Sequence, residues 1–197
     1  MPTSESRTGL IGGIAGGVAA FGLGYLLTYA LTISTVRESS IARLAEAFGD
    51  GGAAWKMVGW VFFNAHGATT TLNVDVPIFG GTSAVNFIAE SEAFSAVLYG
   101  IPPALLLIAG LAAARMAGAT ELGDALRIGP AVVAGYLPLA LIGAVLFTIS
   151  VEGSTGAPTL VTTVGLAGLV YPAVFGTIGA AVGTVLAAGE SRREAAA

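Results

Sequence analysis

The hydrophobic positions of the chain gather into long runs that short polar segments separate. A helix that crosses about 30 Å of hydrocarbon needs about 20 residues at a rise of about 1.5 Å per residue. Four runs meet this length, at about residues 10–33, 94–116, 128–149 and 160–188, and none has an acidic residue inside it. The pattern therefore predicts four strong membrane-spanning helices.

A fifth run, at about residues 55–72, is weaker because it carries Asn64, His66 and three threonines. It is either a short polar spanning helix or a helix that lies at the membrane interface. If it spans, seven of the eight Lys and Arg residues fall on the cytoplasmic side, and otherwise five do. The positive-inside rule favours five spans and hydropathy favours four. The C-terminus is expected in the cytoplasm in both cases.

The segment at about residues 70–88 has a different period. Its apolar residues Leu72, Val74, Val76 and Ile78 alternate with polar ones, and a Gly80-Gly81 pair follows. Alternation of this kind predicts a strand, and the glycines predict a turn. We expect a small β-hairpin on the outer side that pairs residues near Val74 with residues near Val85. The fold class is then an all-α membrane protein, one domain over residues 1–197, with this external hairpin.

The composition supports a chain whose surface faces lipid. Hydrophobic residues make up 55 % and charged residues 10 %, against about 25 % charged residues in soluble domains. The net charge is −4, and the basic residues are scattered, so no nucleic-acid partner is expected. The expected partners are the lipid bilayer and either a second copy of the chain or another membrane protein.

Few residues offer catalytic chemistry. The chain has no cysteine and one histidine, which excludes thiolate chemistry and the usual zinc and copper sites. It lacks a Walker loop, a G-x-S-x-G elbow and an H-E-x-x-H motif. We therefore expect no enzyme activity, no metal site and no cofactor.

His66 and Asn64 are the candidate polar-path or pH-sensing residues. Ionisable groups at membrane depth are costly and often functional, and histidine titrates near neutral pH. The alternative is that His66 ends its helix near the outer interface and bonds the backbone, which the neighbouring Gly67 favours.

Other candidates shape the helices. Pro103, Pro138 and Pro172 lie in three spanning runs and are candidate helix kinks. Small residues four apart allow helices to approach closely, and packing inside the bundle is favoured over dimerisation for them. The candidate helix-packing residues are Gly12, Gly13, Gly16, Gly17, Gly179 and Gly183.

Four segments carry a family resemblance: residues 55–66 (WKMVGWVFFNAH), 98–103 (LYGIPP), 134–139 (AGYLPL) and 168–172 (GLVYP). The chain resembles a family of small, uncharacterised multi-pass membrane proteins of halophilic archaea, sometimes labelled transporters. The resemblance implies no catalytic or binding residue. The function expected from the sequence is a small transporter or permease, or alternatively a structural or assembly subunit of a membrane complex.

Overall fold

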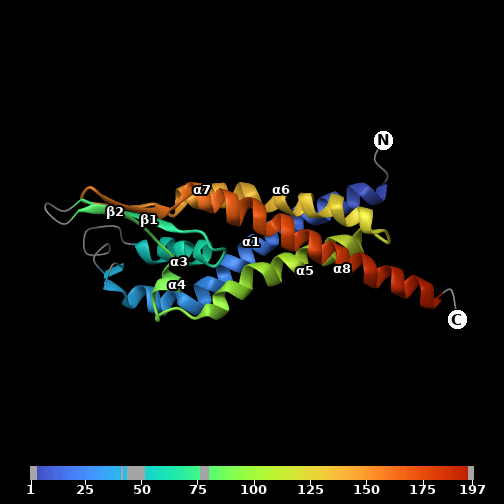
Figure 1. The fold of residues 1–197 in the computed structure, drawn as a ribbon, viewed down its shortest axis with the longest axis horizontal. Coiled ribbons are helices and arrows are strands. Elements are labelled where there is room, and N and C mark those ends of the chain that lie inside the picture. Colours follow the sequence, from blue (N-terminus) through green and yellow to red (C-terminus); the bar gives the residue numbers. More distant parts are fainter. Residues whose placement is uncertain (1–3, 41, 44–51, 76–79, 195–197) are drawn as a thin grey trace. The chain divides into compact units, whose positions relative to one another are not determined.

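The computed structural model describes residues 4–40, 42–43, 52–75 and 80–194 (Figure 1). The chain divides into two compact units, each built from segments that lie far apart in the sequence. Unit 1 contains Met1–Leu23, Pro102–Leu139 and Gly168–Ala197, and unit 2 contains Gly24–Ile101 and Ala140–Ala167.

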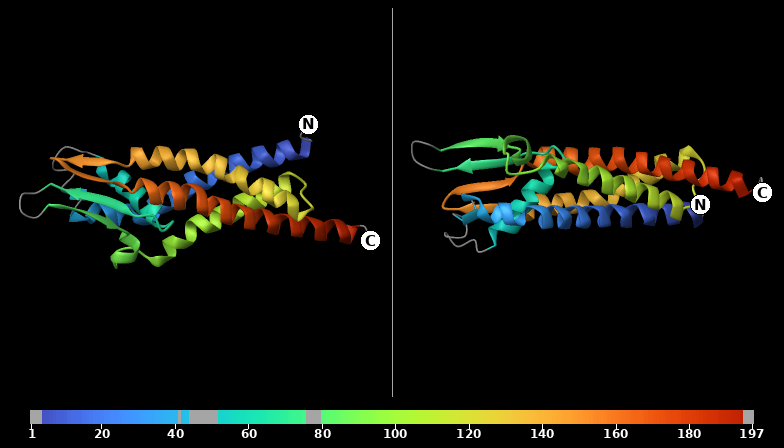
Figure 2. Two further views of the ribbon diagram at one scale, coloured as in Figure 1. Left: turned by 45° about the horizontal axis from the view of Figure 1, so that its top comes forward. Right: turned by 90° about the horizontal axis from the view of Figure 1, so that it is seen from below.

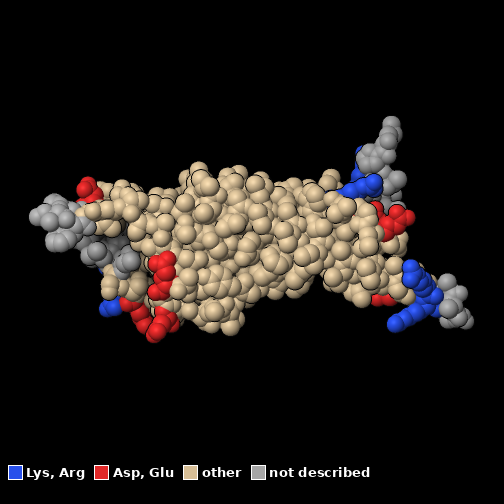
Figure 3. Space-filling view, viewed as in Figure 1, with Lys and Arg blue, Asp and Glu red and all other residues tan. Residues whose placement is uncertain are grey.

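Four long helices dominate the chain, as the hydrophobic runs predict. They are α1 (Ser4–Glu38), α5 (Ile101–Met116), α6 (Leu122–Leu146) and α8 (Tyr171–Glu194). Four stretches are long and apolar enough to cross a membrane: Arg7–Glu38, Ala96–Met116, Leu122–Leu146 and Leu160–Arg193. On the face shown in Figure 3, charged atoms gather near the helix ends and leave the helix middles uncharged.

Unit 1 packs its helices through small side chains. Its buried core cluster consists of Ala113, Ala114, Ala119, Ala125, Ile128 and Ala180. A Cβ added to Gly17 would overlap the carbonyl oxygen of Val132 in α6, and one added to Gly179 would overlap that of Leu107 in α5. Glycine is therefore the residue that lets these backbones come together.

Unit 2 adds short elements between the long helices. They are α3 (Ala53–Asn64), β1 (Thr70–Val74), β2 (Gly81–Val85), α4 (Phe87–Glu90), a 3₁₀ turn η1 (Ala96–Gly100), β3 (Ile149–Val151) and β4 (Ser154–Pro158). The strands form one antiparallel sheet in the order β2-β1-β4-β3 (Figures 1 and 2).

The sheet confirms the hairpin prediction and corrects its register and size. Val74 pairs with Gly81, and Val85 pairs with Thr70, so the predicted pairing of residues near Val74 with residues near Val85 is wrong. The two strands have five residues each, and their adjoining ends, Val74 and Gly81, lie opposite each other. The sheet also contains a second hairpin, β3–β4, in the segment between the third and fourth hydrophobic runs. Its turn holds Glu152 and Gly153 at φ 46° and 85°, and a non-glycine residue at positive φ weakens the turn signal in the sequence.

Helix α3 is shorter than the weak helix expected at about residues 55–72. Helix α3 has 12 residues and a length of about 18 Å, too short for about 30 Å of hydrocarbon. Residues 70–72 belong to strand β1 instead. The helix ends because Gly67 takes φ 74°, which a longer helix could not accommodate.

The last long helix is not uniform. It begins as α7 (Leu160–Thr162), continues as a π-helix, η2 (Thr163–Val170), and becomes α8 at Tyr171. Both views in Figure 2 show these parts, orange to red, as one continuous helix. Pro172 lies in the first turn of α8, directly after the π-helix. The proline of this run therefore coincides with a change of helical register.

Candidate functional site

The end of α3 places His66 in the interior of unit 2. The amide of Gly67 donates to the carbonyl of Asn64 at 2.8 Å, and the amide of Ala68 to that of Phe63 at 3.3 Å. These two bonds form a Schellman motif, which closes a helix at a left-handed glycine. His66 is fully buried, and its Nδ1 lies 2.9 Å from the carbonyl oxygen of Phe62.

Burial changes the titration of His66. Removal from water disfavours the charged imidazolium and lowers the pKa of His66 to about 4, although its contact with the Phe62 carbonyl acts in the opposite direction. A histidine with this pKa is neutral over the physiological range. The geometry therefore favours the backbone-bonding interpretation of His66 over pH sensing near neutrality.

Asn64 and Asn86 connect α3 to the sheet and to α4. The fully buried Asn64 side chain donates to the carbonyl of Ala68 at 2.9 Å and to Thr70 Oγ1 at 3.3 Å, and accepts from the amide of Phe87 at 2.9 Å. Asn86 Nδ2 donates to the Asn64 carbonyl at 3.2 Å. The two side-chain amides therefore bond backbone groups from three segments of unit 2.

Asn86 also caps α4. Its Oδ1 accepts from the amides of Ile88 and Ala89 at 3.1 and 3.2 Å and from the Tyr99 hydroxyl at 3.2 Å. An asparagine at this position satisfies the first amides of a helix. The polar network consequently extends from α3 through α4 to η1.

Trp60 fills the space between α3 and the sheet. Its side chain is 2 % exposed, and its Nε1 donates to the Phe147 carbonyl at 2.6 Å. Its ring stacks on that of Phe87, with 6.1 Å between the ring centroids. A Cβ on Gly156 of β4 would lie 2.5 Å from the indole ring. A glycine in the middle of β4 is thus the residue that lets the strand lie against Trp60.

Threonines join β1 to the start of α7. Thr69 Oγ1 donates to Thr159 Oγ1 at 3.0 Å, and Thr71 Oγ1 lies 2.7 Å from the same Thr159 atom. The Thr69 amide donates to Thr162 Oγ1 at 3.2 Å. The hydroxyl of Thr163, by contrast, is fully buried and has no hydrogen-bond partner among the described residues.

The predicted kink and packing residues lie away from this network. Pro103 occupies the first turn of α5, where a missing amide costs little, whereas Pro138 lies inside α6 together with Pro130. All six candidate helix-packing glycines belong to unit 1. A Cβ on each would meet another helix: Gly12 and Gly16 would meet Ala113 and Ala109 of α5, Gly13 and Gly17 would meet Ala131 and Val132 of α6, and Gly179 and Gly183 would meet Leu107 and Leu111 of α5.

A cavity lies in each of the two units. The cavity of about 170 Å³ in unit 2 is almost wholly apolar and is lined by Val36, Trp60, Val61 and Phe87, among others. The cavity of about 330 Å³ in unit 1 includes Glu121, Asp124 and Arg127. Within the described ranges, no group of three His, Cys, Asp or Glu residues is placed to hold a metal ion.

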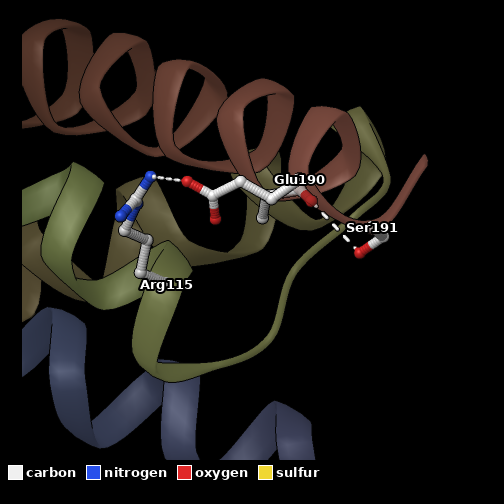
Figure 4. Close-up of polar contacts among 4 residues, drawn as sticks. Arg115, Glu190 and Ser191 are labelled. Carbon is white, nitrogen blue, oxygen red and sulfur yellow. Dashed lines mark hydrogen bonds and ion pairs between the residues drawn. The ribbon is translucent and has the colours of Figure 1, made fainter. Parts of the chain in front are cut away.

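An ion pair joins the ends of α5 and α8. Arg115 lies 3.0 Å from Glu190, and Ser191 donates to the Ala187 carbonyl at 3.2 Å (Figure 4). Both partners of the ion pair are largely exposed, with side chains 44 % and 62 % accessible. An exposed pair of this kind contributes about 0–1 kcal/mol. It marks a helix end and offers no buried charge for chemistry.

Sequence reasoning identified Asn64 and His66 but not their partners. The roles of Asn86, Tyr99 and the threonines were missed because they depend on contacts between different segments, 22 residues apart for Asn86 and Asn64 and 90 residues apart for Thr69 and Thr159. A signal did exist. Threonines cluster at residues 69–71 and again at 159, 162 and 163. Two threonine clusters, each next to a strand, can bond each other through their hydroxyls.

The buried His66 is expected to make stability depend on pH. The unfolded chain binds a proton on His66 below about pH 6.5, whereas the folded chain does so only below about pH 4, so stability should fall as the pH drops through this window. The full loss is about 3 kcal/mol. Thermal unfolding of the purified protein at pH 7, 5.5 and 4 measures it. His66→Asn, which keeps a donor for the Phe62 carbonyl but does not titrate, is the control, and parallel pH profiles of the two proteins would contradict the prediction.

Comparison with known proteins places the chain in a family without assigning it a role. A family of unknown function, DUF7978, matches residues 1–187, so the chain belongs to that family. No curated protein and no solved structure matches it. The halophilic-archaeal origin and the transporter label that the resemblance implied stay predictions.

Proposed function

We propose that this family member is an integral membrane protein that acts as an assembly subunit: four helices span the bilayer, and the sheet of unit 2 binds a partner. The proposal that the helices span a membrane rests on the distribution of their side chains, which is the reverse of that in a soluble protein. Large aliphatic residues point outward, among them Ile11 at 67 % and Val145 at 73 % exposure, while Thr28, Thr32 and Thr184 are buried. Lipid is the solvent in which such a surface is stable.

The strand pairing supports a topology with four spans. Strand β1 follows the first span and β4 follows the third, and their backbones pair from Thr70↔Pro158 to Asn73↔Thr155. The two segments must then lie on the same side of the membrane, which four spans provide. The positive-inside rule places that side outside the cell, because residues 37–95 and 147–159 hold only three of the eight basic residues.

This topology predicts a labelling pattern. The chain has no cysteine, so single cysteines can report on each side. In intact cells, a membrane-impermeant maleimide is expected to label Ser83→Cys and Ser150→Cys, but to label Thr120→Cys and Ser191→Cys only after permeabilisation. All four positions are exposed. Labelling of Ser83→Cys and Ser150→Cys on opposite sides would contradict the sheet, and labelling of Ser191→Cys in intact cells would reverse the orientation.

The feature that supports assembly is the open edge of the sheet. Strand β2 is an edge strand of five residues, Gly81–Val85, with exposed positions, no charge and no proline. Natural proteins usually protect such edges, because unpaired amides and carbonyls accept another strand. The other edge, β3, has three residues and is followed by Glu152. Strand β2 is therefore the edge suited to strand addition.

Charge indicates what kind of partner would bind there. Residues 37–95 and 147–159 contain seven acidic and three basic residues, so this side carries the whole net charge of −4. A second copy would bring the same excess of negative charge. The partner that fits is an extended segment of another membrane protein with basic residues beside it.

Crosslinking from the edge tests this proposal. With a photoreactive phenylalanine in place of Ala84, one adduct is expected in native membranes, and its yield should fall with salt. Neighbouring residues of a strand point their amides to opposite sides. Of Thr82→Pro and Ser83→Pro, one should therefore break the pairing with β1 and lower stability. The other should leave stability unchanged but abolish the adduct.

Two outcomes would count against the proposed partner. An adduct at twice the chain mass of 19.5 kDa would identify a second copy instead. An adduct that neither proline removes, or no adduct at all, would refute binding at the β2 edge.

A further inference from the structure

The π-helix inside the last long helix has a local cause. It spans eight residues, Thr163–Val170, whereas π-helices usually appear as single-turn insertions. Pro172 follows closely, and in α-helical geometry its ring would clash with the carbonyl of Gly168, four residues earlier. Widening the turns before the proline relieves that clash. The segment thus holds one residue more than a regular helix of the same length.

Within the described residues, the hydroxyl of Thr163 at the start of the π-helix lacks the bond that other buried helical threonines make. Three other buried threonines of the described helices donate to the carbonyl four residues earlier: Thr28 to Gly24 at 2.9 Å, Thr32 to Thr28 at 2.7 Å and Thr184 to Ala180 at 2.9 Å. The corresponding acceptor for Thr163 is the carbonyl of Thr159. That oxygen already accepts the Thr163 amide at 2.9 Å and the Thr162 hydroxyl at 3.1 Å. The Thr163 hydroxyl is therefore excluded by its own neighbour.

The neighbour performs a role that Thr163 could perform equally well. Thr162 Oγ1 accepts from the Thr69 amide at 3.2 Å and lies 3.4 Å from Thr69 Oγ1. Since residues 162 and 163 are both threonine, a shift of the helix start by one residue presents the same hydroxyl to Thr69. The contact between β1 and the helix is then retained in both registers.

We propose that Thr163–Val170 is a register switch with two states. In the described state the segment is a π-helix and Thr162 bonds Thr69. In the second state the extra residue moves into the connection after Pro158, the segment becomes α-helical, and Thr163 takes the place of Thr162. The shift turns the start of the helix by about 100° and moves it by about 1.5 Å. The contact with Thr69 couples the helical register to β1. A ligand that binds the sheet more tightly in one state would therefore shift the segment to the register of that state.

A pair of valine substitutions tests the switch. In the wild-type background, Thr163→Val removes an unpartnered buried hydroxyl and is expected to raise the Tm. In the Thr162→Val background, Thr163 is the residue that still bonds Thr69, so the same substitution is expected to lower the Tm. Thr162→Val also frees the Thr159 carbonyl, which Thr163 could then bond without a change of register. The switch therefore requires both this reversal of sign and slower amide exchange over residues 163–170 in Thr162→Val than in the wild type. If Thr163→Val changes the Tm equally in both backgrounds, Thr163 never replaces Thr162 and the proposal is refuted.

Amide hydrogen exchange supplies a second, independent measurement. Pro172→Ala removes the cause of the π-helix and is expected to slow exchange over residues 163–170 by at least about tenfold. Pro138→Ala, in a helix without a π segment, is the control and should leave exchange there unchanged. Equal exchange in the wild type and Pro172→Ala would overturn the switch. Both experiments use the purified chain alone, so their outcome is separate from that of the proposed assembly role.

Discussion

Gly17→Leu is expected to prevent the helices of unit 1 from packing. A side chain at this position would overlap the carbonyl oxygen of Val132 and would come within 3.0 Å of the Tyr136 amide. These are backbone atoms of α6, so α1 would have to move as a whole. Overpacking costs about 1–3 kcal/mol where side chains can adjust, and the cost here should exceed about 3 kcal/mol. Thermal unfolding and size-exclusion profiles of the solubilised protein measure the loss.

Gly22→Leu is the matched control on the same helix. A Cβ at Gly22 meets nothing within 4 Å, and leucine is a better helix former than glycine by about 0.8 kcal/mol. This variant should be as stable as the wild type or slightly more so. If Gly17→Leu folds with wild-type stability, the close approach of α1 and α6 would be incorrect.

Asn64→Leu is expected to separate α3 from the elements around it. The substitution leaves the Phe87 amide and the Ala68 carbonyl without the buried partners that Asn64 gives them at 2.9 Å each. Each unpaired buried group costs about 1–3 kcal/mol, so the total for the two groups should be about 2–6 kcal/mol. The free energy of unfolding measures it, and amide exchange at Phe87 should rise.

Asn73→Leu is the corresponding control in the sheet. Asn73 is exposed and accepts one bond, from Thr82 Oγ1 at 3.3 Å. Its replacement should change stability by no more than about 0.5 kcal/mol, the usual range for surface substitutions. Equal losses for Asn64→Leu and Asn73→Leu would show that the buried network does not stabilise unit 2.

The four long helices could be predicted because their cause is local. A run of about 20 apolar residues without a charge has few other stable conformations. The strands were harder, since alternation is visible in residues 72–78 but not in residues 149–158. In β4, Gly156 and Pro158 interrupt any pattern, and what makes the segment a strand is its pairing with β1.

The candidate site could be predicted only where its cause is local as well. Asn64-Ala-His66-Gly67 signals a helix end, and the structure places a Schellman motif there. The burial of His66 depends on neighbouring rings, such as Phe62 at 4.9 Å, and on other segments that close over it. No spacing along the chain reveals that Asn86 bonds Asn64, or that the Thr163 hydroxyl has no partner in the described part of the chain, because both facts depend on how the segments pack in three dimensions.

The pairing of β1 with β4 determines when the sheet can be completed during synthesis. Thr70 leaves the ribosome 88 residues before its partner Pro158. Until then, the β1–β2 hairpin has two open edges, and a lone hairpin is marginal in water. In the proposed four-span topology, two further helices must be inserted before β4 reaches the same side of the membrane. Completion of the sheet therefore reports that insertion has succeeded. A chain arrested after its third helix would still leave the second edge of β1 open, as a substrate for aggregation or for quality-control proteases.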